Sequence, residues 1–220
     1  MNVAEAVAKR FSARAFLERV PDEAVVRRIL ERALRAPSGG NLQPWRVHAL
    51  TGAPLQALLA EAAQGRIETP EYHVYPENLW EPFRSRRFQN GEDLYASLGV
   101  ARADKAGRLA QFVKNFQLFG APVALFFSLD RRLGPPQWSD MGMFMQTVML
   151  LAVEEGLDAC AQEAWSRFPQ TLRRQLGLGD EEMVFAGMAL GYADAEHPIN
   201  QWRTPRADFE SIVTLKGFSS

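Results

Sequence analysis

The chain has 220 residues, of which 47% are hydrophobic and 23% charged, and its formal net charge at pH 7 is −1. This composition is typical of a globular protein and excludes a disordered chain, while the near-zero charge disfavours bulk attraction to nucleic acid or anionic lipid. No apolar run approaches the roughly 18 residues of a membrane-spanning helix, and the first residues lack the basic and apolar regions of a secretory signal. We therefore expect a cytoplasmic protein that binds neither nucleic acid nor a membrane.

The N-terminal part of the chain predicts three helices and a strand. Residues 2–10 are typical of a short helix, and apolar residues at i, i+3, i+4 spacing indicate a second helix over 22–35, which Pro37 ends. A Ser-Gly-Gly-Asn loop then precedes a predicted strand over 45–50 and a predicted helix over 54–63.

Residues 65–118 are less regular, because three prolines interrupt stretches of amphipathic helical pattern. The remaining predicted elements are, in chain order, a buried strand over 123–129, a helix over 141–155 closed by Gly156, a strand over 157–161, a helix over 169–176 and a strand over 183–192. Helices and strands mix without a regular βαβ alternation, so we predict the α+β class in one domain that spans residues 1–220.

The predicted helix over 141–155 is apolar nearly all the way round and must be covered on several sides. Either it lies at the centre of the domain or a second subunit covers one side of it. The tail beyond Arg206 is also apolar enough to dock on another surface; its apolar residues are Phe209, Ile212, Val213 and Leu215.

Catalytic and metal-binding constellations are absent from the sequence. Cys160 is the only cysteine, and the histidines His48, His73 and His197 lie far apart without ligand spacing. No GxSxG elbow, P-loop or strand-linked GxGxxG occurs. We therefore predict neither a metal site nor a catalytic side chain. In an enzyme of this kind, a cofactor would supply the reactive group.

The segment Lys9-Arg10-Phe11-Ser12-Ala13-Arg14 is the first candidate ligand site. If it is extended, Arg10, Ser12 and Arg14 project to one side, which suits a phosphate dianion, while the alternate residues anchor the segment in the core. The alternative is a solvated helix end, where the helix dipole favours arginine.

The second candidate ligand site is the loop Pro37-Ser38-Gly39-Gly40-Asn41. Its glycines let backbone approach a flat ligand closely, and the amides of Asn41 and Gln43 match the mixed donors and acceptors along the edge of an isoalloxazine ring. The alternative is a plain connection between a helix and a strand.

Two further segments complete the set. Gln162, Glu163 and Ala164 follow a buried strand, where ligand contacts are common, although they could equally be surface residues. Arg203 and Arg206 flank a proline turn and could join Arg10 and Arg14 in a phosphate clamp; the alternative is a solvated turn.

In order along the chain, these segments resemble the FMN-dependent nitroreductases over nearly the whole sequence. The shared elements are RFSARAF, APSGGNLQPW, FGAPVALFF, the D-x-G-x-F-x-Q helix from Asp140, GLDACAQEAW and NQWRTPRADFE. The resemblance implies an α+β fold with a central, mostly antiparallel sheet wrapped by helices. It also implies an intertwined homodimer that exchanges its C-terminal extensions and holds two FMN sites at the interface.

The resemblance also implies a set of cofactor-binding residues. Those expected at the FMN phosphate are Arg10, Ser12, Arg14, Arg203 and Arg206. Those expected from the loop of the other subunit are Pro37, Ser38, Gly39 and Asn41. Those expected along the ring are Gln162, Glu163 and Ala164. Gly39 and Ala164 depart from the family's frequent serine and glycine, but both remain small.

The implied activity is ping-pong hydride transfer from NADH or NADPH through FMN to nitroaromatic, quinone or related acceptors. A flavin-dependent ene-reductase, dehydrogenase or oxidase on the same scaffold, and a flavin-binding protein without turnover, remain alternatives. Residues 70–118 correspond to the family's variable lid over the substrate pocket. We expect Arg84, Arg86 or Arg87 in this lid to favour an acceptor that carries a carboxylate or nitro group.

Overall fold

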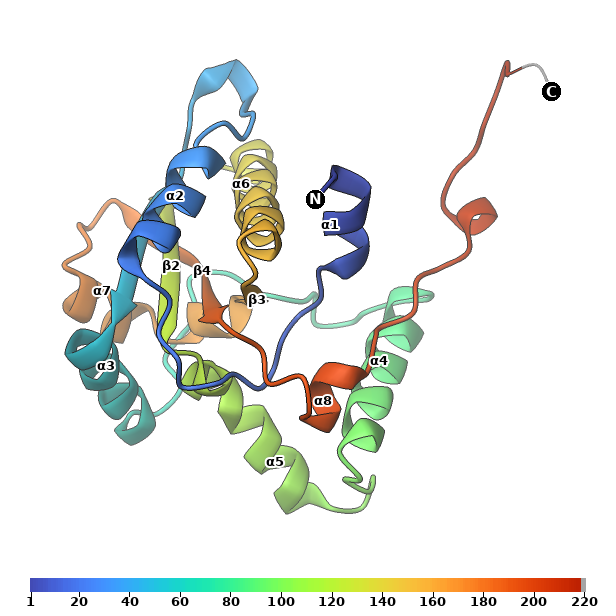
Figure 1. Ribbon diagram of the computed structural model, residues 1–220, viewed down its shortest axis with the longest axis horizontal. Coiled ribbons are helices and arrows are strands. Elements are labelled where there is room, and N and C mark those ends of the chain that lie inside the picture. Colours follow the sequence, from blue (N-terminus) through green and yellow to red (C-terminus); the bar gives the residue numbers. More distant parts are fainter. Residues whose placement is uncertain (219–220) are drawn as a thin grey trace.

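The computed structural model describes residues 1–218 and contains a four-stranded antiparallel sheet between layers of helices (Figure 1). The spatial order of the strands is β1-β2-β4-β3. Their bounds are β1 Arg46–Thr51, β2 Val123–Asp130, β3 Asp158–Gln162 and β4 Glu182–Gly191. The predicted α+β class is confirmed, and each predicted strand lies within one residue of its observed bounds.

The central strands explain why the sequence of β2 is continuously apolar. Leu125 and Phe127 point into the core on one face of the sheet, whereas Ala124 and Phe126 point into the core on the other. Because both faces are covered, the strand has no solvated side and shows no alternation of polar residues.

The face that carries Leu125 is covered by α6 (Pro135–Glu154) and α2 (Glu23–Ala33), with α1 (Val3–Lys9) packed against α6. The predicted start of α6 at residue 141 is wrong by six residues. Pro135 and Pro136 occupy the first helical turn, where a missing N–H leaves no hydrogen bond unmade. Most of α6 is enclosed, but Met143 is 39% exposed.

The opposite face is covered by α3 (Gly52–Gln64) and α7 (Pro169–Leu176), together with two 3₁₀ segments. Trp165 is fully buried there, with its indole against Gly187 of β4. The left-handed Gly177 ends α7, whose bounds match the helix predicted over 169–176.

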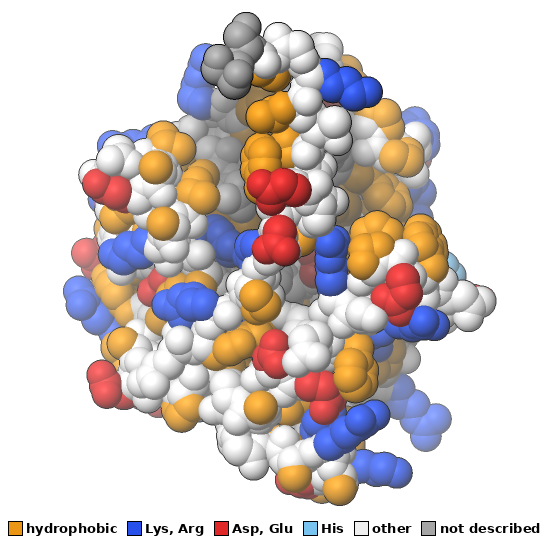
Figure 2. All heavy atoms as spheres, turned by 90° about the vertical axis from the view of Figure 1, so that its right-hand side faces the viewer, with side chains coloured by type: hydrophobic (Ala, Val, Ile, Leu, Met, Phe, Trp, Pro, Cys, Tyr) orange, Lys and Arg blue, Asp and Glu red, His pale blue; other side chains and the backbone are white. Residues whose placement is uncertain are grey.

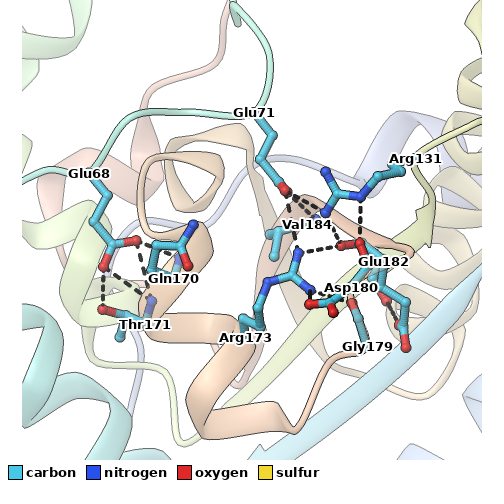
Figure 3. A network of polar contacts seen from close by, with 11 residues as sticks. Glu68, Glu71, Arg131, Gln170, Thr171, Arg173, Gly179, Asp180, Glu182 and Val184 are labelled. Atoms are coloured by element: carbon cyan, nitrogen blue, oxygen red, sulfur yellow. Dashed lines mark hydrogen bonds and ion pairs between the residues drawn. The ribbon is translucent and has the colours of Figure 1, made fainter.

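Residues 65–118 contain two helices, α4 (Phe83–Ser97) and α5 (Lys105–Val113). The start of this region is fastened to the domain by two carboxylates (Figure 3). Glu68 accepts hydrogen bonds from the amides of Gln170 and Thr171 at the first turn of α7, at 2.6 and 3.1 Å. Glu71 lies between arginines and accepts from one backbone amide; its partners are Arg131 at 3.0 Å, Arg173 at 3.5 Å and the Val184 amide at 2.9 Å.

The chain ends with α8 (Pro198–Gln201) and a tail that runs away from the rest of the molecule (Figure 1). Residues 203–218 are all exposed, so the apolar tail does not dock on its own domain as far as the chain is described. No helix among the described residues has the length and apolar character to cross a membrane.

Candidate functional site

The segment is extended after Arg10, which is the C-cap of α1, so the alternative of a helix end applies to Arg10 but not to Ser12 or Arg14. Ser12 forms a parallel bridge with Ala159 of β3, and the Ala13 amide donates to the Ala159 carbonyl at 3.2 Å. Ala13 is fully buried. The side chains of Arg10, Ser12 and Arg14, which alternate with Ala13, are only partly buried.

These side chains gather around the thiol of Cys160 in β3. Burial raises the pKa of Cys160 to about 11, and the nearby Arg14, Ser12 and Arg10 oppose the shift. Burial also lowers the pKa of Arg10, and the charge of Arg206 lowers it further. Arg10 and Arg206, from the two ends of the chain, therefore lie close enough for their charges to interact.

Arg203 completes this set, which we call the arginine group (Arg10, Arg14, Arg203 and Arg206). Its guanidinium carbon lies 3.8 Å from the centre of the Phe11 ring, and it donates to the backbone carbonyls of Asn200 and Trp202. The guanidinium of Arg206 likewise donates to the carbonyl of Thr204 at 2.8 Å.

No member of the arginine group forms an ion pair with a carboxylate within residues 1–218, although other arginines of the chain do. Arg28, for example, lies 2.7 Å from Glu155. The charge of Asp158 acts on Arg203, but the four positive charges exceed it and together favour a bound anion. A phosphate dianion fits this donor set, because each guanidinium presents several N–H groups.

Asn200 holds the two halves of the arginine group together, and sequence reasoning did not single it out. It is 3% exposed. Its Oδ1 accepts from the Arg14 amide at 2.8 Å, and its Nδ2 donates to the carbonyls of Ala15 and Asp194, both at 2.8 Å. The only signal in the sequence was its place at the start of the Asn200–Arg206 segment.

The end of β3 carries the next three predicted site residues. Gln162 is buried, its Nε2 donates to the Asn115 carbonyl at 2.7 Å, and its Oε1 has no partner among the described residues. Glu163 is exposed and Ala164 partly buried at the start of a 3₁₀ turn. The amide of Gln162 thus ties the end of the lid region to the strand beside the arginine group.

The loop of predicted site residues after α2 is shaped by α6. The Gly39 amide donates to Asp140 Oδ1 at 3.1 Å, and the Gln43 amide donates to Ser38 Oγ at 3.0 Å. Gly40 and Asn41 have φ values of 59° and 55°, in the left-handed region that favours glycine and tolerates asparagine. Pro37, Gly39 and Asn41 are exposed and Ser38 is partly buried.

Asp140 is a second residue that sequence reasoning left without a role. It is 4% exposed, and its Oδ2 is buried without a hydrogen-bond partner in the described chain. A buried carboxylate oxygen normally has a donor, so this atom indicates that a further group belongs beside the loop.

The loop and the arginine group lie apart within one chain. Asp140 is near the start of α6, whereas Ala159 follows the other end of that helix, and about 20 Å of helix separates Asp140 from Glu154. Among residues 1–218, no hydrogen bond or ion pair joins the loop to the arginine group. One chain therefore brings together Arg10, Ser12, Arg14, Glu163, Arg203 and Arg206, but not the loop.

The model of the Nitroreductase family matches residues 7–192. A 4-nitrobenzoate reductase from Pseudomonas putida is 38% identical over 215 residues, which span 96% of this chain and 94% of that protein.

Two solved structures are similar along their whole length. The FMN and NADPH-dependent nitroreductase NfnB from sphigopyxis sp. strain HMH is 51% identical with a TM-score of 0.96, covering 99% of this chain and all of that one. NfnB from Mycobacterium smegmatis, solved in complex with NADPH, is 29% identical with a TM-score of 0.89, covering 98% and 100%. The chain belongs to the Nitroreductase family.

Proposed function

We propose that the protein is an FMN-dependent oxidoreductase that uses NADH or NADPH to reduce nitroaromatic, quinone or related electrophilic acceptors. The observation that carries the proposal is the arginine group, which gathers beside β3 without forming an ion pair to any carboxylate of residues 1–218. The similarity to an FMN and NADPH-dependent nitroreductase and to a 4-nitrobenzoate reductase supports the same activity.

One set of residues would bind the phosphate of FMN. Arg10, Ser12 and Arg14 would hold the phosphate of FMN, with Arg203 and Arg206 closing over it from the other end of the chain. Burial and the charge of Arg206 lower the pKa of Arg10, and a bound phosphate would oppose this shift. Asn200, through its hydrogen bonds to Arg14 and Ala15, would hold the N-terminal and C-terminal arginines in fixed positions relative to one another.

The ring of FMN would lie along Gln162, Glu163 and Ala164. When bound, FMN supplies two-electron transfer between the nicotinamide and the acceptor. The chain would orient the ring through small residues and backbone groups and exclude water from one of its faces. No side chain is required as a nucleophile, so we name no catalytic residue.

The loop Pro37, Ser38, Gly39 and Asn41 would complete the site from a second subunit. Its distance along α6 from the arginine group of its own chain supports a homodimer. The partnerless Oδ2 of Asp140 also supports a neighbour at this loop.

The exposed C-terminal tail, residues 203–218, could stabilise such a dimer. Strand β1 is an edge of the sheet, and a mainly apolar cavity of about 730 Å³ lies between β1 and α2, bordered by Trp45, Val47 and Leu30. The other edge, β3, is already covered by residues 12–13. We propose that the tail of a second copy fills this cavity with its apolar residues, which lie exposed in one chain (Figure 2).

We further propose that residues 1–220 form one domain and that residues 70–118 form a lid over the acceptor. The hydrogen bonds of Glu68, Glu71 and Gln162 fix both ends of this region and leave α4, which buries none of its residues, exposed between them. Cytoplasmic localisation stays a prediction.

Anaerobic reduction tests the proposal. The purified protein is expected to carry the absorbance of oxidised flavin, to lose it on addition of NADH or NADPH, and to recover it when 4-nitrobenzoate is added. Bound flavin that neither nucleotide reduces would make the protein a flavin-binding module. A protein without flavin, even after incubation with FMN, would contradict the proposal altogether.

A further inference from the structure

The lid helix α4 and the residues that follow α8 enclose a second cavity, of about 700 Å³, with an excess of positive charge. The side chains that matter are Arg86 and Arg87 from α4, Arg206 from the tail, Tyr75 and Asp93. Figure 2 views the side on which the tail lies and shows Lys and Arg side chains on both flanks of it.

Most other arginines of the lid already have partners. Arg84 lies 2.8 Å from Glu81, and Arg108 binds both carboxylate oxygens of Glu92, at 2.6 and 3.0 Å. Arg102 lies over the ring of Phe88. These contacts neutralise or occupy the arginines concerned.

Arg86 and Arg87 differ from Arg84 and Arg108 in having no ion pair among the described residues, and from Arg102 in bordering the cavity. Arg87 is held with its guanidinium carbon 4.4 Å from the centre of the Tyr75 ring. Asp93, the one acidic residue that borders the cavity, accepts a hydrogen bond from Gln89 at 2.6 Å. Even with Arg206 assigned to the phosphate of FMN, the cavity has Arg86 and Arg87 against the one carboxylate of Asp93, which favours an oxyanion.

The position of the cavity identifies which oxyanion it suits. Arg206 borders the cavity, and its charge acts on Arg10, so the cavity adjoins the arginine group. Under the proposed function, the phosphate of FMN lies here and the reacting ring lies elsewhere. A carboxylate on a one-ring acceptor is too close to its reacting group to reach this cavity while that group touches the ring. The adenosine end of a dinucleotide lies at the far end of the molecule from its nicotinamide and can reach it.

We propose that this cavity binds the 2′-phosphate of NADPH, with Arg86 and Arg87 as the residues that distinguish NADPH from NADH. Tyr75 and the guanidinium of Arg87 provide flat surfaces for the adenine. The inference rests on the proposed function, because it takes FMN reduction by a nicotinamide cofactor as given, and it assigns the nucleotide preference to two residues outside the arginine group.

The test compares the two nucleotides in holoenzyme variants. The wild type is expected to have the higher kcat/KM with NADPH. In R86A/R87A the NADPH-to-NADH ratio of kcat/KM is expected to fall about tenfold or more, since hydrogen bonds to a charged group are lost. R86K/R87K keeps the charge and should retain part of the preference, and the matched control R84A, from the same helix, should retain all of it.

Direct binding provides a readout that does not depend on turnover. Adenosine 2′,5′-bisphosphate should bind the wild type more tightly than adenosine 5′-monophosphate does in calorimetry, and R86A/R87A should abolish the difference. A wild type that uses NADH as well as NADPH, or a ratio unchanged in R86A/R87A, would overturn the inference.

Two other outcomes would also overturn it and reassign the arginines. Loss of FMN from R86A/R87A would place them in the flavin site. A fall in the preference for 4-nitrobenzoate over nitrobenzene, with the nucleotide ratio unchanged, would assign them to the acceptor. Failure of the proposed function itself looks different, because the wild type would then carry no reducible flavin.

Discussion

Replacing Asn200 with alanine removes the amide that joins the two ends of the chain at the arginine group. Three hydrogen bonds are lost, to the Arg14 amide and to the carbonyls of Ala15 and Asp194, all at 2.8 Å. At about 1 kcal/mol each, the free energy of unfolding should fall by about 3 kcal/mol. Affinity for FMN should fall as well, because the side chain that joins the Arg14 segment to the residues before Arg203 is lost.

Urea unfolding of the flavin-free protein measures this effect without the contribution of bound cofactor. The matched control is Gln201→Ala, since the neighbouring amide is exposed and makes one long hydrogen bond of 3.5 Å; it should change stability by less than about 0.5 kcal/mol. If Asn200→Ala destabilised no more than Gln201→Ala, the claim that Asn200 positions the arginine group would be refuted.

Three further predictions follow from the same structure. R10A/R14A should lose FMN on desalting while its far-UV circular dichroism stays native, because two charge-assisted contacts are worth at least about a hundredfold in Kd; retained flavin would count against the clamp. Burial lowers the pKa of His48 in the folded state. As pH falls below about 6.5, His48 is therefore protonated in the unfolded state while it is still neutral in the folded state, and the free energy of unfolding should decrease. In His48→Gln that part of the decrease should vanish, and an unchanged pH profile would contradict the assignment. A Cβ on Gly187 would lie 2.6 Å from Trp165 Cδ1, so Gly187→Ala should cost about 1–3 kcal/mol and lower Tm in thermal unfolding; an unaltered Tm would show that the indole moves freely.

Local patterns predicted the fold well, because the signals are short in range. The unbroken apolar run of β2 and the αL glycine that ends α7 each depend on a few neighbouring residues. The start of α6 was missed because Pro135 and Pro136 are breakers inside a helix but fit its first turn.

The candidate site was predictable only in part. The alternation around Ala13 predicted which side chains share a face, and the bridge to β3 confirms the extended segment. That Arg10 meets Arg206 depends on contacts between distant parts of the chain, such as the bond between Arg14 and Asn200, 186 residues apart. No local pattern encodes such a contact. By contrast, the ion pair that removes Arg84 from the candidates in the lid joins it to Glu81, three residues earlier, a spacing that is visible in the sequence.

The central claim is that the arginine group of one chain and the Pro37–Asn41 loop of another form a single FMN site. Mixed dimers test it most directly. One chain, with its own affinity tag, carries R10A/R14A; the other, with a second tag, carries S38E/N41E, which places carboxylates where the loop would face the phosphorylated cofactor. Neither variant alone should bind FMN, whereas dimers purified through both tags should bind one FMN per dimer, since one intact arginine group then meets one intact loop. Mixed dimers without flavin, when wild-type dimers bind two, would contradict the account.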